Sequence, residues 1–169
     1  MPNLKDSSDA HIVQVAAAIV RLNGGTIGTR KLWSIMYLVD RSNLDIIGDR
    51  LSGTEFSVTP SGLRPNIPDN RFIKTSGRFT TLVEDPGNDE LSEHDDTELE
   101  KACKHYKSFT EEQLVRMVKS FPEAIRPAGY VISREDILLA RGYLEHDVNE
   151  ILEPIRHVEA IDRMLGNTP

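Results

Sequence analysis

Apolar residues recur at helical spacing through the first fifty residues. From Ser8 or Asp9 to Leu22 they occupy more than one face, which predicts a first helix placed centrally in the core. Residues 23–25, Asn-Gly-Gly, tolerate a positive φ and would end it, and residues 24–28 read as a turn between helices. We expect Thr29 to cap a second helix. One face of that helix has apolar residues at i, i+3, i+4 and i+7, namely Leu32, Ile35, Met36 and Val39.

The helical period disappears between Gly48 and Asp85. Residues 55–59 alternate in polarity and predict a short strand, and the Gly/Pro-containing residues 61–65 predict a corner after it. A brief helical turn is expected at 66–70. Residues 72–74 and 78–83 flank Thr-Ser-Gly and predict a β-hairpin. The sequence gives no other convincing β region.

Three helix starts in the second half carry capping boxes. Ser92, Thr110 and Ser133 each precede an acidic residue or glutamine by three positions, the pattern in which cap and third residue satisfy each other's backbone amides. We therefore expect a predominantly helical α+β fold, in which a small β-hairpin or short sheet is inserted after the second helix.

The final segment, from Glu145 to Leu165, again has apolar residues at helical spacing. Pro154 must kink this helix or begin a new one, since proline donates no backbone hydrogen bond. We expect the main domain to span residues 1–142 and residues 143–169 to form a helical extension packed on it. Docking of a partner or of a second copy is the alternative role for this helix.

Composition describes a globular chain of one domain. It has 169 residues, of which 38% are hydrophobic and 28% charged. The longest apolar run, residues 12–20, is too short to cross a bilayer, and residues 1–9 lack the basic and apolar parts of a signal peptide. Cys103 is the single cysteine, which excludes an internal disulfide and suits a reducing compartment. A cytoplasmic location without membrane attachment follows as the expectation.

The net charge of -7 is unevenly distributed. Residues 21–78 contain nine basic and five acidic residues, whereas residues 84–112 contain eleven acidic residues and three lysines. Either these two segments form two solvated faces of one domain, or the basic segment forms a surface for an acidic partner. A nucleic-acid-binding regulator that uses Arg21–Arg78 is the alternative, although the acidic total and the scarcity of interleaved aromatic residues make nucleic acid an unlikely partner.

Motifs for catalysis are lacking. None of the five histidines is in a short zinc-binding spacing, so we expect no metal, no cofactor and no enzymatic activity. His94, Asp95 and Asp96 invite comparison with metal-dependent phosphohydrolases, and a hydrolase is kept as a third hypothesis. The trio falls in the first turn after Ser92, where helix capping explains acidic residues more simply.

Trp33 and Tyr37 are four residues apart and form an aromatic stripe on the second helix. Core packing is the first interpretation, because both side chains bury large areas. Anchoring a protein partner is the second, because these residue types dominate interface energetics. Our candidate partner-binding group joins this stripe to the region that follows the second helix: Trp33, Tyr37, Arg64, Arg71 and Phe72.

Several short segments occur in a characteristic order and spacing between roughly residues 10 and 141. The segments are Lys31–Leu32, Tyr37–Arg41, Gly48–Gly53, Glu55–Phe56, Ser61–Pro65, Leu91–Ser92, Tyr106, Phe109–Leu114 and Ile132–Leu138. In these segments the chain resembles the SocA-like, or Panacea, antitoxin domain of bacterial and phage toxin–antitoxin systems. The chain departs from the family at the corner, where Ser61 and Leu63 replace a histidine and a proline.

The resemblance implies a non-enzymatic module that neutralises a toxin encoded beside it. Direct stoichiometric binding is the expected mode, and delivery of the toxin to a protease is a second mode in such proteins. A second copy of the chain is a further candidate partner. The identity of the toxin is not implied.

Overall fold

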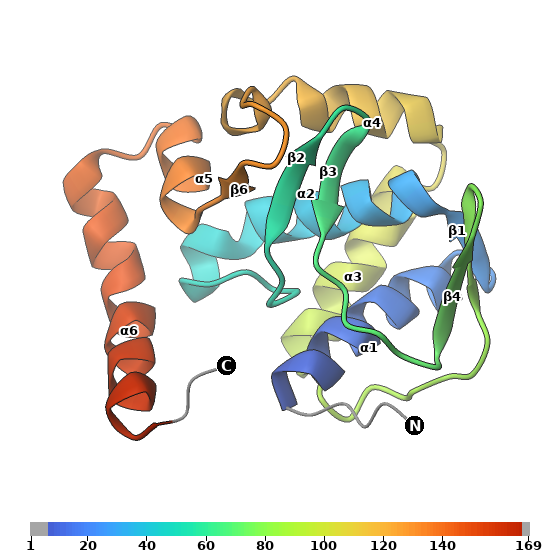
Figure 1. Ribbon diagram of the computed structural model, residues 1–169, viewed down its shortest axis with the longest axis horizontal. Coiled ribbons are helices and arrows are strands. Elements are labelled where there is room, and N and C mark those ends of the chain that lie inside the picture. The colour runs from blue at the N-terminus through green and yellow to red at the C-terminus, as the bar shows by residue number, and fades with distance from the viewer. Residues whose placement is uncertain (1–6, 167–169) are drawn as a thin grey trace.

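The computed structural model describes residues 7–166 and has a predominantly helical α+β architecture, as predicted (Figure 1). Residues 1–6 and 167–169 lie outside the described range. The expectation that residues 1–9 are not a signal peptide, and the end of the predicted extension, fall partly on these residues. The helices are α1 (Ser7–Leu22), α2 (Thr29–Ile47), α3 (Glu93–Tyr106), α4 (Glu111–Lys119), the 3-10 helix η1 (Pro122–Ala124), α5 (Arg134–Ala140) and α6 (Glu145–Met164). The strands are β1 (Thr26–Gly28), β2 (Phe56–Thr59), β3 (Gly62–Pro65), β4 (Ile73–Ser76), β5 (Phe79–Leu82) and β6 (Val131–Ile132).

Two helices form the centre of the molecule. Residues 12–20 of α1 are all buried, which confirms the predicted central position of this helix. Helix α2 runs across the middle of Figure 1 and packs against α1, α3, α4, α5 and β3. Its apolar face is buried as predicted, and Tyr37 is completely buried beside it.

The start of α2 differs from the prediction. Gly28, not Thr29, is the N-cap residue, and Thr29 is the first residue of the helix. The Thr29 hydroxyl is 2.9 Å from the Thr80 hydroxyl on β5, and the Thr29 amide donates to the Arg78 carbonyl. The threonine therefore joins α2 to a sheet instead of capping the helix.

Two three-stranded antiparallel sheets flank these helices, in the orders β1-β5-β4 and β3-β2-β6. The predicted hairpin is confirmed as β4 and β5, but its turn lies at residues 77–78, with Gly77 at a φ of 59°. Strand β2 is also confirmed. Three predictions are wrong: residues 24–28 contain β1, the corner at 61–65 is strand β3 paired with β2, and residues 66–70 form no helical turn.

The three capping boxes are confirmed. The hydroxyls of Ser92, Thr110 and Ser133 accept from the third helical amides of α3, α4 and α5, and the side chains of those third residues accept from the cap amides. These boxes form because both partners lie within four residues of sequence, so no distant contact is needed.

Helix α6 continues through Pro154 as one element, so a new helix does not begin there. Val148 and Leu152 belong to the same buried cluster as α1 and α2, and Ile151 and Ile155 pack against it. The distal part leaves Val158, Ile161, Met164 and Leu165 exposed. Helix α6 thus packs on the core through its first half. Among the helices within residues 7–166, none has the length and apolar character needed to span a membrane.

Candidate partner-binding surface

Trp33 and Arg64 meet at the surface where β3 lies on α2. Trp33 is half-buried in the first turns of the helix, and its indole packs on the core. Arg64 is exposed on β3, and its guanidinium carbon is 5.9 Å from the centroid of the Trp33 ring. This distance permits a cation–π contact. The pair joins an apolar face to a cation that keeps hydrogen-bond donors available to a partner.

A hollow of about 400 Å³ lies between the start of α2 and the exposed face of α4. Arg30 lines it and is three residues before Trp33, so the two side chains are neighbours on α2. Val115 faces Gly62, the first residue of β3, and the Lys119 ammonium donates to the Pro60 carbonyl at 3.0 Å. Contacts therefore run from the hollow to the β2–β3 hairpin that carries Arg64. The hollow is lined by Arg30, Glu112, Val115, Arg116, Lys119 and Ser120.

Part of the positive charge around the hollow is already balanced. Arg30 forms an ion pair with Glu111, with an N···O distance of 3.0 Å, and Glu112 adds a second carboxylate. No ion pair involves Arg64 or Arg116 within residues 7–166. The exposed surface near Trp33 is consequently cationic and has a small apolar centre.

Arg71 and Phe72 form a second pair at the entry to β4. The Arg71 guanidinium carbon is 5.1 Å from the Phe72 ring centroid, and a guanidinium nitrogen is 3.4 Å from a Glu84 carboxylate oxygen. Within residues 7–166, no hydrogen bond, ion pair or cation–π contact joins this pair to Trp33 or Arg64. The contacts therefore join Trp33 to Arg64 and Arg71 to Phe72 as two separate pairs.

Tyr37 is not a surface residue, which corrects its place among the candidates. Its ring stacks edge-to-face on Phe56 with centroids 5.2 Å apart, and its hydroxyl donates to Glu123 at 2.7 Å. Burial, followed by the Glu123 hydrogen bond, raises the pKa of Tyr37. The core interpretation of the aromatic stripe therefore applies to Tyr37, and a partner could touch only Trp33.

The basic stretch 21–78 is not one continuous cationic surface. Arg21 pairs with Asp85 at 2.7 Å, and Arg41 pairs with the buried Glu123 at 2.6 Å. Arg50 is half-buried and donates to the Ile132 carbonyl at 2.6 Å. These arginines contribute to internal contacts, which leaves fewer cations for a phosphate backbone.

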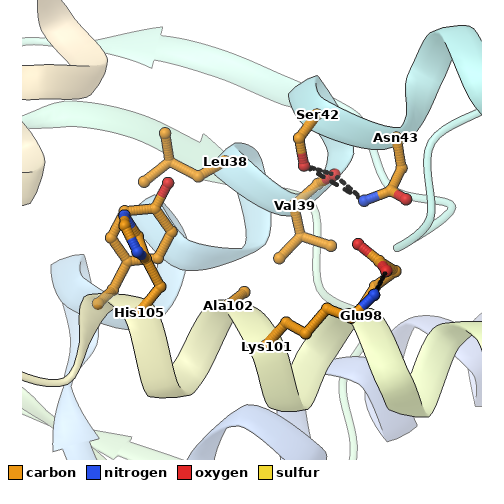
Figure 2. A pocket seen from close by; sticks show the side chains of 9 residues that line it. Leu38, Val39, Ser42, Asn43, Glu98, Lys101, Ala102 and His105 are labelled. Carbon is orange, nitrogen blue, oxygen red and sulfur yellow. Dashed lines mark hydrogen bonds and ion pairs between the residues drawn. The ribbon is translucent and has the colours of Figure 1, made fainter.

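A second hollow of about 400 Å³ lies between α2 and α3 (Figure 2). Leu38, Val39 and Ala102 give it apolar walls, and Glu98 and Lys101 pair with each other at 2.7 Å. The Lys101 hydrogen bond lowers the pKa of Glu98, so this carboxylate stays charged. Glu98 and Lys101 neutralise each other, so neither charge is available to bind a ligand. We therefore assign no chemical role to this hollow.

His94, Asp95 and Asp96 do not converge on a common point. A ring nitrogen of His94 lies 3.2 Å from the Asn43 side-chain oxygen, Asp95 accepts from the Ser92 amide, and Asp96 accepts from Asn88. The capping interpretation of Asp95 is confirmed. Within residues 7–166, no group of three or more metal-binding side chains is close enough to hold an ion.

Sequence analysis missed most of the hollow beside Trp33. Val115, Arg116 and Lys119 lie more than fifty residues after Arg64, and no pattern in the sequence indicates that α4 packs on β3. Comparison with known proteins adds no further residues: no protein-family model, curated protein or solved structure matches this chain.

Proposed function

We propose that this chain is a cytoplasmic antitoxin that neutralises a protein toxin by direct stoichiometric binding. The resemblance to SocA-like domains suggests the role, and the Trp33–Arg64 pair is the observation that carries it here. Tryptophan and arginine are the residue types most often responsible for interface affinity. The neighbouring hollow adds Val115, Arg116 and Lys119, so we expect the toxin to present an acidic surface around an apolar side chain.

The experiment is co-expression with the adjacent open reading frame. We expect that frame to arrest growth alone, and this chain to relieve the arrest and co-purify with its product. Arg64→Glu should abolish rescue without altering the fold, since Arg64 is exposed. Trp33→Ala with Arg64→Ala should do the same. Harmless expression of every neighbouring frame would remove the proposed function.

Arg126 and Tyr130 provide a matched control. Their guanidinium carbon and ring centroid are 5.5 Å apart, and both residues are exposed. Alanine at both positions should preserve rescue, while Arg71→Ala with Phe72→Ala tests whether the second pair contributes. Rescue that survives both Arg64→Glu and the Trp33–Arg64 double variant would contradict this surface. Loss of the toxin from cells, instead of accumulation of a complex, would identify protease delivery as the mode.

Nucleic-acid binding is the alternative, and the exposed cations Arg64, Arg116 and Lys119 are the observation that favours it. A regulator of this kind should shift DNA or RNA with an affinity that falls steeply as salt rises, because bound phosphates release counterions. Glu111 balances the charge of Arg30 and so reduces the positive charge that a nucleic acid would need, which favours a protein partner. A salt-dependent shift that Arg64→Glu removes, without any neutralised toxin, would make the regulator the better assignment.

A further inference from the structure

Strand β4 forms an open edge of its sheet. It pairs with β5 on one side, and no strand within residues 7–166 pairs with its other side, because the sheet order is β1-β5-β4. Lys74, Thr75 and Ser76 are exposed, and among the helices and strands that the structure describes only β5 contacts β4 extensively. Figure 1 shows β4 at the margin of the molecule, at the end opposite α6.

The hydrogen-bonding pattern identifies which backbone groups lie on this edge. The Val83 amide donates to the Phe72 carbonyl, so Phe72 and Val83 form a bonded pair. Bonded and non-bonded pairs alternate in antiparallel strands, so Lys74–Thr81 and Ser76–Phe79 are also bonded. The N–H and C=O of Thr75 and the C=O of Ile73 therefore point away from β5. The Ile73 N–H also points outward, where it donates to the Asn70 side-chain oxygen at 2.9 Å.

The corresponding edge of the other sheet is protected. Strand β3 is an edge strand, but Leu63 is 4% exposed and both α2 and α4 pack against the strand. Pro65 removes one backbone donor from it. Natural proteins commonly cover such edges or place proline on them to prevent pairing with another chain. Within the part of the chain that the structure describes, no helix or strand covers the free side of β4. The strand itself contains no proline, and Lys74 is its single charged residue.

Charge and exposed apolar area select the kind of strand that would pair with β4. Arg71 and Arg78 flank β4, whose own Lys74 is exposed; within residues 7–166, no ion pair involves Lys74 or Arg78. Phe79 is 57% exposed opposite Ser76, on the same outward face as Lys74. Arg71 is balanced by Glu84, but pairing of two β4 strands from two copies would still bring two Lys74 and two Arg78 side chains together, so a second copy is disfavoured.

We propose that β4 binds an extended acidic segment of a partner protein as a fourth strand of the β1-β5-β4 sheet. The Thr75 N–H and C=O supply the backbone hydrogen bonds. Lys74 and Arg78 attract the carboxylates, and Phe79 contacts an apolar residue of the added strand. This mode of recognition obtains affinity from the main chain and selectivity from alternate side chains. It goes beyond the proposed function, because it holds for an acidic partner of any activity.

A blocked octapeptide of alternating valine and glutamate is the probe, with the valine–lysine octapeptide as charge control. Binding is followed by fluorescence anisotropy, and amide hydrogen exchange of the full chain by NMR. We expect the acidic peptide to bind with a dissociation constant below about 1 mM. Exchange of the Thr75 amide should slow on binding, whereas the Lys74 and Ser76 amides, already paired with β5, should change little.

Two variants test the two parts of the interaction. Lys74→Glu should weaken binding about 5- to 10-fold, because an attractive cross-strand pair becomes repulsive. Arg163→Glu makes the same charge change on α6, at the opposite end of the molecule, and should change affinity less than about twofold. Thr75→Pro should weaken binding about tenfold, since it removes the outward N–H and proline is tolerated at a free edge.

A peptide N-methylated at alternate residues lacks the N–H groups that would donate to the Thr75 and Ile73 carbonyls. It should bind the unaltered protein about tenfold more weakly than the acidic octapeptide, so a folding defect in Thr75→Pro does not affect the conclusion. Failure of the acidic octapeptide to bind at about 1 mM would overturn the proposal. Equal binding of the lysine peptide, or protection of amides away from Thr75, would also overturn it. None of these outcomes bears on toxin neutralisation through Trp33 and Arg64, so the two proposals fail separately.

Discussion

Removal of the Tyr37 hydroxyl tests whether a buried hydrogen bond to a carboxylate stabilises the fold. The hydroxyl donates to Glu123 Oε1 at 2.7 Å, and both side chains are inaccessible to solvent. Tyr37→Phe keeps the ring and its edge-to-face contact with Phe56. The substitution therefore isolates the hydrogen bond from the packing of the aromatic group.

The structure limits the size of the effect. Hydrogen bonds to charged groups contribute about 1.5–3 kcal/mol. Glu123 Oε1 keeps a second donor, Arg41 Nε at 2.6 Å, so the variant does not leave this oxygen without a partner. We therefore expect Tyr37→Phe to lower the free energy of unfolding by about 1.5–2 kcal/mol, toward the lower end of that range.

Two other tyrosines in this chain provide matched controls at greater exposure. Tyr143 donates to Asp45 at 2.6 Å and is half-buried, while Tyr130 donates to Asp136 at 2.9 Å and is 38% exposed. Water can replace both bonds in part. We expect losses of about 0.5–1 kcal/mol for Tyr143→Phe and below about 0.5 kcal/mol for Tyr130→Phe.

Urea unfolding followed by circular dichroism measures the series. With a slope of about 1–3 kcal/mol per molar urea, Tyr37→Phe should lower the midpoint by roughly 0.5–2 M, more than either control. Equal losses for the three variants, or a loss for Tyr37→Phe below about 0.5 kcal/mol, would refute the argument that burial sets the strength of this bond.

The remaining predictions concern Asp40 and Gly48. Burial raises the pKa of Asp40 to about 7, despite two hydrogen bonds from Ser52. A raised folded-state pKa means that the folded protein binds the proton more tightly than the unfolded chain does. The contribution of Asp40 to the free energy of unfolding should therefore decrease as the pH rises from about 4 to about 7. Urea titrations across this range should show that decline in the wild type and its absence in Asp40→Asn. Gly48 ends α2 at a φ of 73°, and an added Cβ would lie 3.0 Å from the Ile151 carbonyl. Gly48→Ala should lower the free energy of unfolding by about 1–2 kcal/mol, and the melting temperature with it. Gly77→Ala should lower the free energy of unfolding by less, because no atom lies within 4 Å of the added Cβ.

The helices of the second half were predictable because their signals are local. Ser92, Thr110 and Ser133 each form both bonds of a capping box with a residue three positions later. The alternation in β2 and the glycine at the β4–β5 turn are equally local signals. In each case the residues that decide the structure are neighbours in sequence, so the pattern carries the information.

The edges of the sheets depended on distant partners. Thr26 pairs with Thr81, and Gly28 with Phe79, so β1 exists only because a strand fifty residues later lies beside it. The same sheet takes the Thr29 hydroxyl and amide, which is why the expected cap is not formed. A three-residue segment has no periodicity of its own from which this pairing could be predicted.

The candidate surface shows the same division. The sequence by itself determined the helix that carries Trp33 and Tyr37, the position of both on one stripe, and the residue types suited to a protein interface. Tertiary structure decided that Tyr37 is buried against Phe56 and Glu123, and that Trp33 stays accessible beside Arg64. The physical reason is that helical periodicity places side chains relative to their own helix axis, whereas exposure depends on which distant elements pack against each face.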